Sequence, residues 1–264
     1  MKEIFELKRF GKYVSYDLAH AWEKYGFSLL LTGFLPVILY VILMILRLIF
    51  NQEVSGDGQL YQMLPFFIIL GVVMSFGSKV YGEVTERKAG SSWIALPASA
   101  LEKTLSLLLI TCVLLPACLL ALLWLSHTIL SLFRPDLGSF LYGFDSLYSG
   151  IAADGESYFN TPLVIWLGWV VTILIFTLGA LCFKKNKVGK TILCIFAFGV
   201  LLSILAMLFF KRTYFSSDDF ERLFGDFTPE KAELWINTIL NIFYTVVIGG
   251  LIAGILARIK TIKA

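Results

Sequence analysis

The chain has 264 residues, of which 58% are hydrophobic and 16% charged, and its formal net charge is +3 at pH 7. Soluble domains usually contain about 25% charged residues, so this chain lacks the polar surface that covers a water-soluble globule of its size. A bilayer removes the need for that surface. The composition therefore excludes an ordinary soluble protein and predicts a membrane protein.

The N-terminal segment, residues 1–26, has the spacing of an amphipathic helix. Apolar residues recur every three or four positions, and charged residues fill the other side. Such a helix is typical of the membrane surface, where it either only anchors the N-terminus or provides a docking element. The apolar set is Phe10, Tyr13, Val14, Leu18, Ala21, Trp22 and Tyr25, and the charged set is Lys8, Arg9, Lys12, Asp17, Glu23 and Lys24.

Six apolar runs follow, each long enough to cross hydrocarbon, which takes about 20 helical residues. The second run is interrupted by Pro65 and small residues, which membrane helices tolerate. No signal peptide is expected, because the first run is too long and follows a mixed-charge segment. We expect a single, all-α membrane domain with spans at about 27–50, 61–80, 105–130, 163–183, 191–210 and 234–257.

The connections between these spans differ in charge. The N-terminal segment, the connections around 79–104 and 184–190, and the C-terminal tail hold 16 basic and 7 acidic residues. The opposite set holds 6 basic and 12 acidic residues. Because basic residues accumulate on the cytoplasmic side, both termini are expected in the cytoplasm. The chain is expected to be an integral protein of the bacterial inner membrane.

Catalytic motifs are missing. Gly189-Lys190-Thr191 is the nearest approach to a phosphate-binding loop, but Lys184 stands where that motif needs a glycine, and no strand precedes it. The two histidines are far apart, and no group of residues has metal-ligand spacing. The four cysteines lie in apolar runs and are expected to be buried free thiols. We therefore predict no enzyme activity, metal or cofactor in this chain.

The connection between the second and third spans is the most polar long segment near the middle of the chain. It opens with Glu86-Arg87-Lys88-Ala89-Gly90, and a short apolar patch of Trp93, Ile94 and Leu96 then ends at Pro97. This order predicts a short amphipathic helix parallel to the membrane, followed by a stop.

Ser99 and Glu102 come next, at the spacing of a capping box. Ser99 is the expected N-cap, and the side chain of Glu102 is expected to return to its backbone N–H. Two interpretations of the whole connection remain open. It is either a tight turn whose apolar residues dip back into the membrane interface, or a rigid cytoplasmic knob that a partner grips.

The pattern E-R-x-x-G, followed after several residues by L-P-x-S-x-x-E-K, resembles the cytoplasmic loop of type-2 ATP-binding-cassette (ABC) exporter permeases. In that family an E-R-G-T-like beginning and an L-x-x-P-x-S-like end flank the coupling helix that docks on the ATPase subunit. The amphipathic N-terminal helix and the six-span layout are similar too. This chain departs from the pattern at Gly90-Ser91, displaced by two residues, and at Glu102, where a glycine is usual.

The resemblance implies that ATP is bound by a partner ATPase, which docks on residues 85–104, and that a second permease copy or relative completes the pathway. The N-terminal helix would supply a second contact with the ATPase. The implied coupling residues are Glu86, Arg87, Gly90, Trp93, Ile94, Leu96, Pro97, Ser99 and Glu102, with Lys103 at the start of the third span.

The external segments 131–162 and 211–233 are acidic and aromatic, which suits either a short re-entrant element or a plain interfacial loop. Since the span interiors lack charged residues, energy for transport would come from outside the chain. The alternative function is a non-transporting six-span scaffold, assembly factor or regulatory protein, which shares the hydropathy and orientation. Residues 85–104 distinguish the two, because only a permease needs them to bind an ATPase.

Overall fold

The computed structural model describes residues 5–50, 58–85, 96–133, 135, 161–212 and 229–263. Every regular element among these residues is helical, as the sequence predicts. The helices are α1 (Leu7–Gly33), α2 (Leu35–Phe50), α3 (Gly58–Val80), the 3₁₀ helix η1 (Gly82–Thr85), α5 (Ala100–Leu108), the π-helix η2 (Leu109–Leu114), α6 (Leu115–Phe133), α8 (Thr161–Cys182), α9 (Lys187–Arg212) and α11 (Pro229–Lys263).

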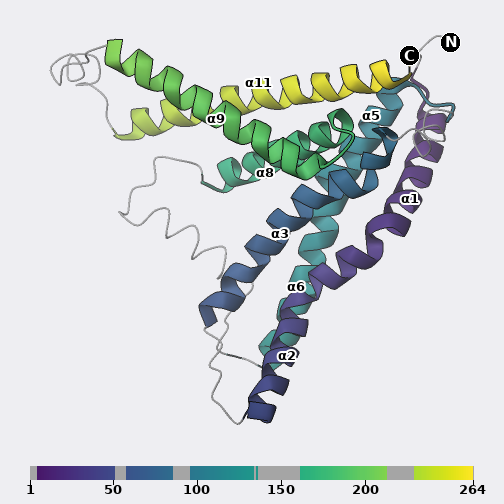
Figure 1. The fold of residues 1–264 in the computed structure, drawn as a ribbon, viewed down its shortest axis with the longest axis vertical. Helices are drawn as coiled ribbons and strands as arrows, with labels where there is room; N and C mark the ends of the chain where they lie inside the picture. Colours follow the sequence, from purple (N-terminus) through teal and green to yellow (C-terminus); the bar gives the residue numbers. More distant parts are fainter. Residues whose placement is uncertain are drawn as a thin grey trace.

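The helices form two groups that diverge from one end of the molecule (Figure 1). The first group contains α1, α2, α3 and α6, and the second contains α9 and α11. Helix α8 joins them, since it packs against α3, α9 and α11. Helix α1 begins and α11 ends where the groups meet.

The hydrophobic core lies where the groups meet. It is centred on side chains with no exposed surface: Leu107, Leu174, Leu181, Ile255 and Ile259. These residues come from α5, α8 and the C-terminal half of α11. In a bilayer the lipid tails are as apolar as leucine, so close packing rather than removal from water holds such a core together.

Three helical stretches are long and apolar enough to cross a membrane: Ala100–Phe133, Lys187–Leu208 and Asn237–Ile262. They coincide with the predicted third, fifth and sixth spans. The apolar stretches Phe67–Val80 and Trp166–Cys182 are shorter, and α1 with α2 would count as a span only as a bent pair. The structure thus supports membrane insertion, while the count of six spans stays a prediction.

The predicted first span is not one straight helix. Helices α1 and α2 meet at a bend of 50° around Phe34. Pro36 lies in the first turn of α2, where its missing N–H does not cost a hydrogen bond, and its ring prevents α1 from continuing through it. On the other side of the bend, Gly33 lets α1 approach α6 closely, because a Cβ there would lie 2.6 Å from Cβ of Leu122.

A separate amphipathic helix over residues 1–26 is not confirmed. Helix α1 runs without a break from Leu7 to Gly33 and packs against α3 and α5. Two members of the predicted apolar face, Leu18 and Trp22, are exposed, whereas Asp17, predicted on the charged side, is buried. The buried residues Tyr13, Asp17, Ala21, Tyr25 and Leu29 follow each other at intervals of four.

All four cysteines are free, as predicted, but the prediction that they are buried is wrong. Cys112 and Cys118 are half-buried, and Cys182 and Cys194 are exposed. The exposed pair lies on α8 and α9 at positions that no described helix covers, and a thiol on such a surface is compatible with lipid.

The contact between Gly33 and Leu122 generates a stability prediction. Gly33→Ala should lower the free energy of unfolding by about 1–3 kcal/mol, because the added methyl forces α1 away from α6. Gly11→Ala is the matched control in the same helix, since a Cβ there meets nothing within 4 Å and alanine is the better helix former. Thermal melting of the purified protein in detergent would contradict this if both variants melted alike.

Candidate functional site

The segment that joins α3 to α5 carries the predicted partner-binding residues, and both of its described ends are fixed to other helices. One end is η1, which follows α3. The other runs from Leu96 to Ser99 and leads into α5.

The Ser99 end is closed by the predicted capping box. Ser99 has an extended backbone conformation, with φ −68° and ψ 161°, and its Oγ accepts a hydrogen bond from the backbone N–H of Glu102. In return, the backbone N–H of Ser99 donates to Oε2 of Glu102 over 2.7 Å. Two of the backbone donors that lack an intrahelical partner at the start of α5 are thus satisfied.

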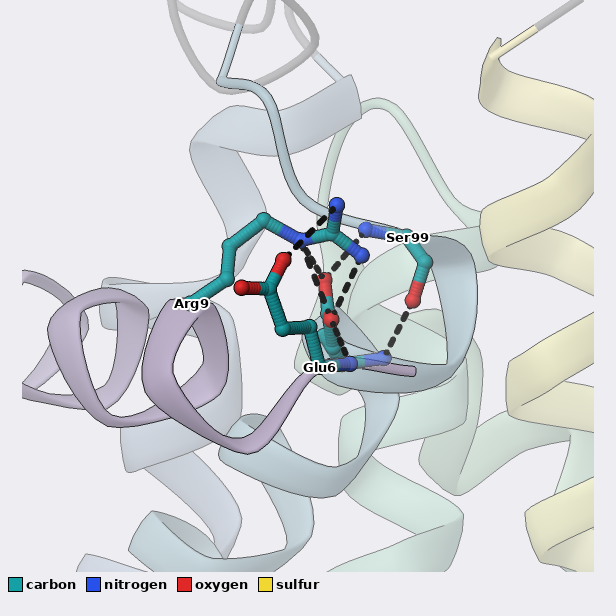
Figure 2. Close-up of polar contacts among 4 residues, drawn as sticks. Glu6, Arg9 and Ser99 are labelled. Carbon is teal, nitrogen blue, oxygen red and sulfur yellow. Dashed lines mark hydrogen bonds and ion pairs between the residues drawn. The ribbon is translucent and has the colours of Figure 1, made fainter. Parts of the chain in front are cut away.

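The same carboxylate also binds the start of α1 (Figure 2). Arg9 donates from Nε to Oε2 of Glu102 over 2.9 Å and from Nη2 to Oε1 over 2.7 Å. The backbone N–H of Glu6 donates to Oε1 over 3.0 Å. We call this arrangement of Glu6, Arg9, Ser99 and Glu102 the Glu102 clasp. It joins two segments separated by more than ninety residues in the sequence.

The clasp fixes Glu102 in its charged form. Its side chain has no exposed surface, and an unpaired carboxylate in that position would be strongly destabilising. Hydrogen bonding to Arg9 lowers the pKa of Glu102 from 4.5 to about 2, more than burial raises it. Glu102 lies in the first turn of the stretch Ala100–Phe133 and before the predicted span 105–130, so the clasp lies at the end of the helix.

A second polar contact holds α1 two turns further on. The carboxylate of Asp17 is 3% exposed, and its Oδ2 accepts hydrogen bonds from Oγ of Ser106 over 2.7 Å and from the hydroxyl of Tyr81 over 3.2 Å. Burial raises the pKa of Asp17 above its ordinary value, and these hydrogen bonds and the nearby His20 and Lys103 offset only part of that rise. Helix α1 is therefore attached to both ends of the connecting segment, at Tyr81 and at α5.

The η1 end is attached to the turn between α8 and α9. Nζ of Lys187, on the first residue of α9, donates to the carbonyl oxygen of Gly82. A Cβ at position 82 would lie 2.8 Å from that nitrogen, so glycine permits the approach. Oγ1 of Thr85 lies 3.5 Å from the carbonyl oxygen of Phe183.

The two attachments lead to different groups of helices. The Ser99 end is tied to α1, and the η1 end is tied to α8 and α9 as well. A displacement of the connecting segment would therefore act on both groups where they meet. An arrangement of this kind is suited to transmitting rigid-body motion, because packed helices move as units.

The structure places only part of the predicted site. Leu96 is half-buried, Pro97 is exposed, and Ser99 and Glu102 are buried in the clasp, with Lys103 buried beside them. Those two clasp residues are brought together as predicted. The other predicted coupling residues lie outside the described residues: Glu86, Arg87, Gly90, Trp93 and Ile94.

Sequence reasoning did not assign Arg9, Asp17 or Lys187 to the site. For Asp17 a signal was present, because it continues the four-residue interval of Tyr13, Ala21 and Tyr25. For Arg9 and Lys187 no local pattern identifies the partner, which in each case comes from a distant part of the chain.

Within the described ranges, no group of His, Cys, Asp or Glu side chains could hold a metal ion. No protein-family model, curated protein or solved structure matches this chain.

The clasp predicts a large loss of stability on neutralising its carboxylate. Glu102→Gln should lower the free energy of unfolding by about 2 kcal/mol or more, because Arg9 and two backbone donors lose a charged acceptor. Glu6→Gln is the matched control, since Glu6 is 63% exposed and its carboxylate lies 4.0 Å from Arg9; exposed pairs contribute less than about 1 kcal/mol. Equal melting temperatures for the two variants would contradict the clasp.

The clasp also predicts a pH dependence. The folded-state pKa of Glu102, about 2, lies below its ordinary value of 4.5, so its stabilisation is complete above pH 4.5 and is lost as the pH falls toward 2. The difference in melting temperature between wild type and Glu102→Gln should be constant from about pH 5 to about pH 8 and shrink in acid. A difference that already shrank between pH 8 and pH 6 would contradict this ionisation state.

Proposed function

We propose that the chain is the membrane-spanning permease subunit of an ABC exporter, driven by a separate ATPase subunit that docks on residues 85–104. Both termini are cytoplasmic in this proposal, and the protein resides in the bacterial inner membrane. The observation that carries it is the Glu102 clasp. It joins the two segments that the family resemblance assigns to the ATPase, the N-terminal helix and the end of the coupling loop.

Rigidity of this joint is what such a machine requires. Closure of an ATPase dimer is a rigid-body motion, which a soft loop would absorb. Here the buried charge of Glu102 accepts hydrogen bonds from Arg9, Glu6 and Ser99, so the two segments cannot separate without leaving it unpaired. A force on the loop would reach α1 and, through α5, η2 and α6, the whole third span.

Six spans complete the proposed architecture. Three are the helical stretches long enough to cross a membrane, and α1 with α2, α3 and α8 would supply the others. In this architecture the cytoplasmic side, where the basic connections lie, includes the clasp, the turn between α8 and α9, and the end of α11. A pathway for cargo would form with a second permease copy.

Docking can be tested with two substitutions. Leu96→Asp places a charge at the half-buried end of the loop, and Arg9→Met breaks the clasp without changing a residue of the loop. Each should reduce the ATPase activity recovered with the tagged protein, isolated from its host in mild detergent, by about tenfold or more. Glu6→Gln should recover as much ATPase as the wild type.

Two outcomes would contradict the proposal. Wild-type protein that brought no ABC ATPase through several detergents would favour the non-transporting scaffold. Recovery that was insensitive to both Leu96→Asp and Arg9→Met would place the ATPase contact elsewhere.

A further inference from the structure

The turn between α8 and α9 carries a cluster of cations without acidic partners in the described part of the chain. Lys184 and Lys185 are exposed and make no hydrogen bond or ion pair with any residue that the structure describes. Nζ of Lys190 lies 5.9 Å from the centre of the Phe183 ring, at the start of the same turn. The sequence from 157 to 217 contains no Asp or Glu that could neutralise these charges locally.

The end of α11 adds a further cation. Nε of Arg258 donates over 3.1 Å to the carbonyl oxygen of Leu181. That carbonyl is among the last four of α8, which lack partners within their own helix, so the guanidinium caps α8 and is held beside the turn. Helix η1, which Lys187 joins to the turn, contributes one acidic residue, Glu83. We call the following residues the turn patch: Lys184, Lys185, Lys190 and Arg258.

The backbone under the turn patch is held in a fixed conformation. Asn186 has φ 50°, in the left-handed region that asparagine tolerates better than most residues. A Cβ at Gly179 would collide with the side chain of Thr191, so α8 and α9 are in close contact next to the turn. The like charges of the patch therefore repel each other across a backbone that cannot easily spread, and a bound anion would remove that repulsion.

The surface next to the turn patch is apolar, and this selects the kind of anion. Ile192, Leu193 and Phe196 on α9 are 46%, 68% and 71% exposed. Lys190 and Leu193 are three residues apart, so they are neighbours on one side of the helix. A ligand that covers both needs a negative head and a hydrocarbon tail. A soluble phosphate would satisfy only the cations.

We propose that the turn patch binds the phosphate headgroup of an anionic phospholipid, whose acyl chains lie along the exposed side of α9. Lysine and arginine donate charge-assisted hydrogen bonds to phosphate oxygens, and basic pockets between membrane helices recognise such headgroups. The turn is at the right depth, because the stretch Lys187–Leu208, long and apolar enough to cross a membrane, begins there. The inference requires these helices to be in a membrane, but it requires neither an ATPase nor a second copy of the chain.

The test is lipid binding by the whole protein, purified in dodecyl maltoside and titrated with phosphatidylglycerol in native mass spectrometry. Wild type should bind phosphatidylglycerol about tenfold more tightly than phosphatidylcholine with the same acyl chains, because each cation near the headgroup strengthens binding by roughly fivefold. Lys184→Gln combined with Lys185→Gln should remove most of this preference. Lys184→Arg combined with Lys185→Arg keeps both charges and should retain it.

Lys8→Gln combined with Lys12→Gln is the matched control. Both lysines are exposed near the start of α1, where Arg9 between them is already paired with Glu102. This pair removes the same two charges from the protein and should leave phosphatidylglycerol binding almost unchanged. Melting temperatures in phosphatidylcholine show whether each variant is folded, and the arginine pair keeps the test decisive if the glutamine pair at the turn melts early.

Equal binding of the two lipids, or an equal loss in the two glutamine pairs, would overturn the inference. The source of the phosphate is tested with glycerol phosphate, which is a phosphate headgroup without acyl chains. It should bind far more weakly than phosphatidylglycerol, and equal binding would indicate a site for a soluble anion and overturn the inference. These assays contain no ATPase. Their failure would refute the lipid site alone, and failure to recover an ATPase would refute the proposed function alone.

Discussion

A carboxylate with no exposed surface must be paired, and the organisation of this protein around Glu102 follows from that constraint. Removing the charge from water costs several kcal/mol. The structure offsets this with a guanidinium and with backbone donors from two distant segments. Because the donors come from α1 and from the start of α5, satisfying the charge also fixes where the N-terminal helix lies.

The other polar contacts extend the same arrangement. Asp17 attaches the middle of α1 to Ser106 and Tyr81, and Lys187 attaches the start of α9 to Gly82. All three contacts lie where the two groups of helices meet, whereas the distant halves of α9 and α11 are bare. The polar contacts fix how the two groups of helices are joined. The distant halves of α9 and α11 are apolar and exposed, so lipid or another chain covers them.

Several elements could be predicted from the sequence because their signals are local. The capping box is read from the four residues Ser99 to Glu102, and the third span from one continuous apolar run. The bend at Phe34 could not be predicted from the apolar run 27–50, which hydropathy reads as continuous. The partners of Glu102 and Asp17 could not be predicted either, because the pairing of distant residues depends on how the helices pack and not on any local spacing.

The central proposal is that Arg9 and Glu102 form one rigid joint that supports the segment on which an ATPase docks. A double-mutant cycle measures this directly, with recovered ATPase activity as the readout for wild type, Arg9→Met, Glu102→Gln and the double variant. If the two residues act as one joint, each single change removes most of the recovered activity and the double variant loses little more. Losses that multiplied in the double variant, or no loss in either single variant, would contradict the account.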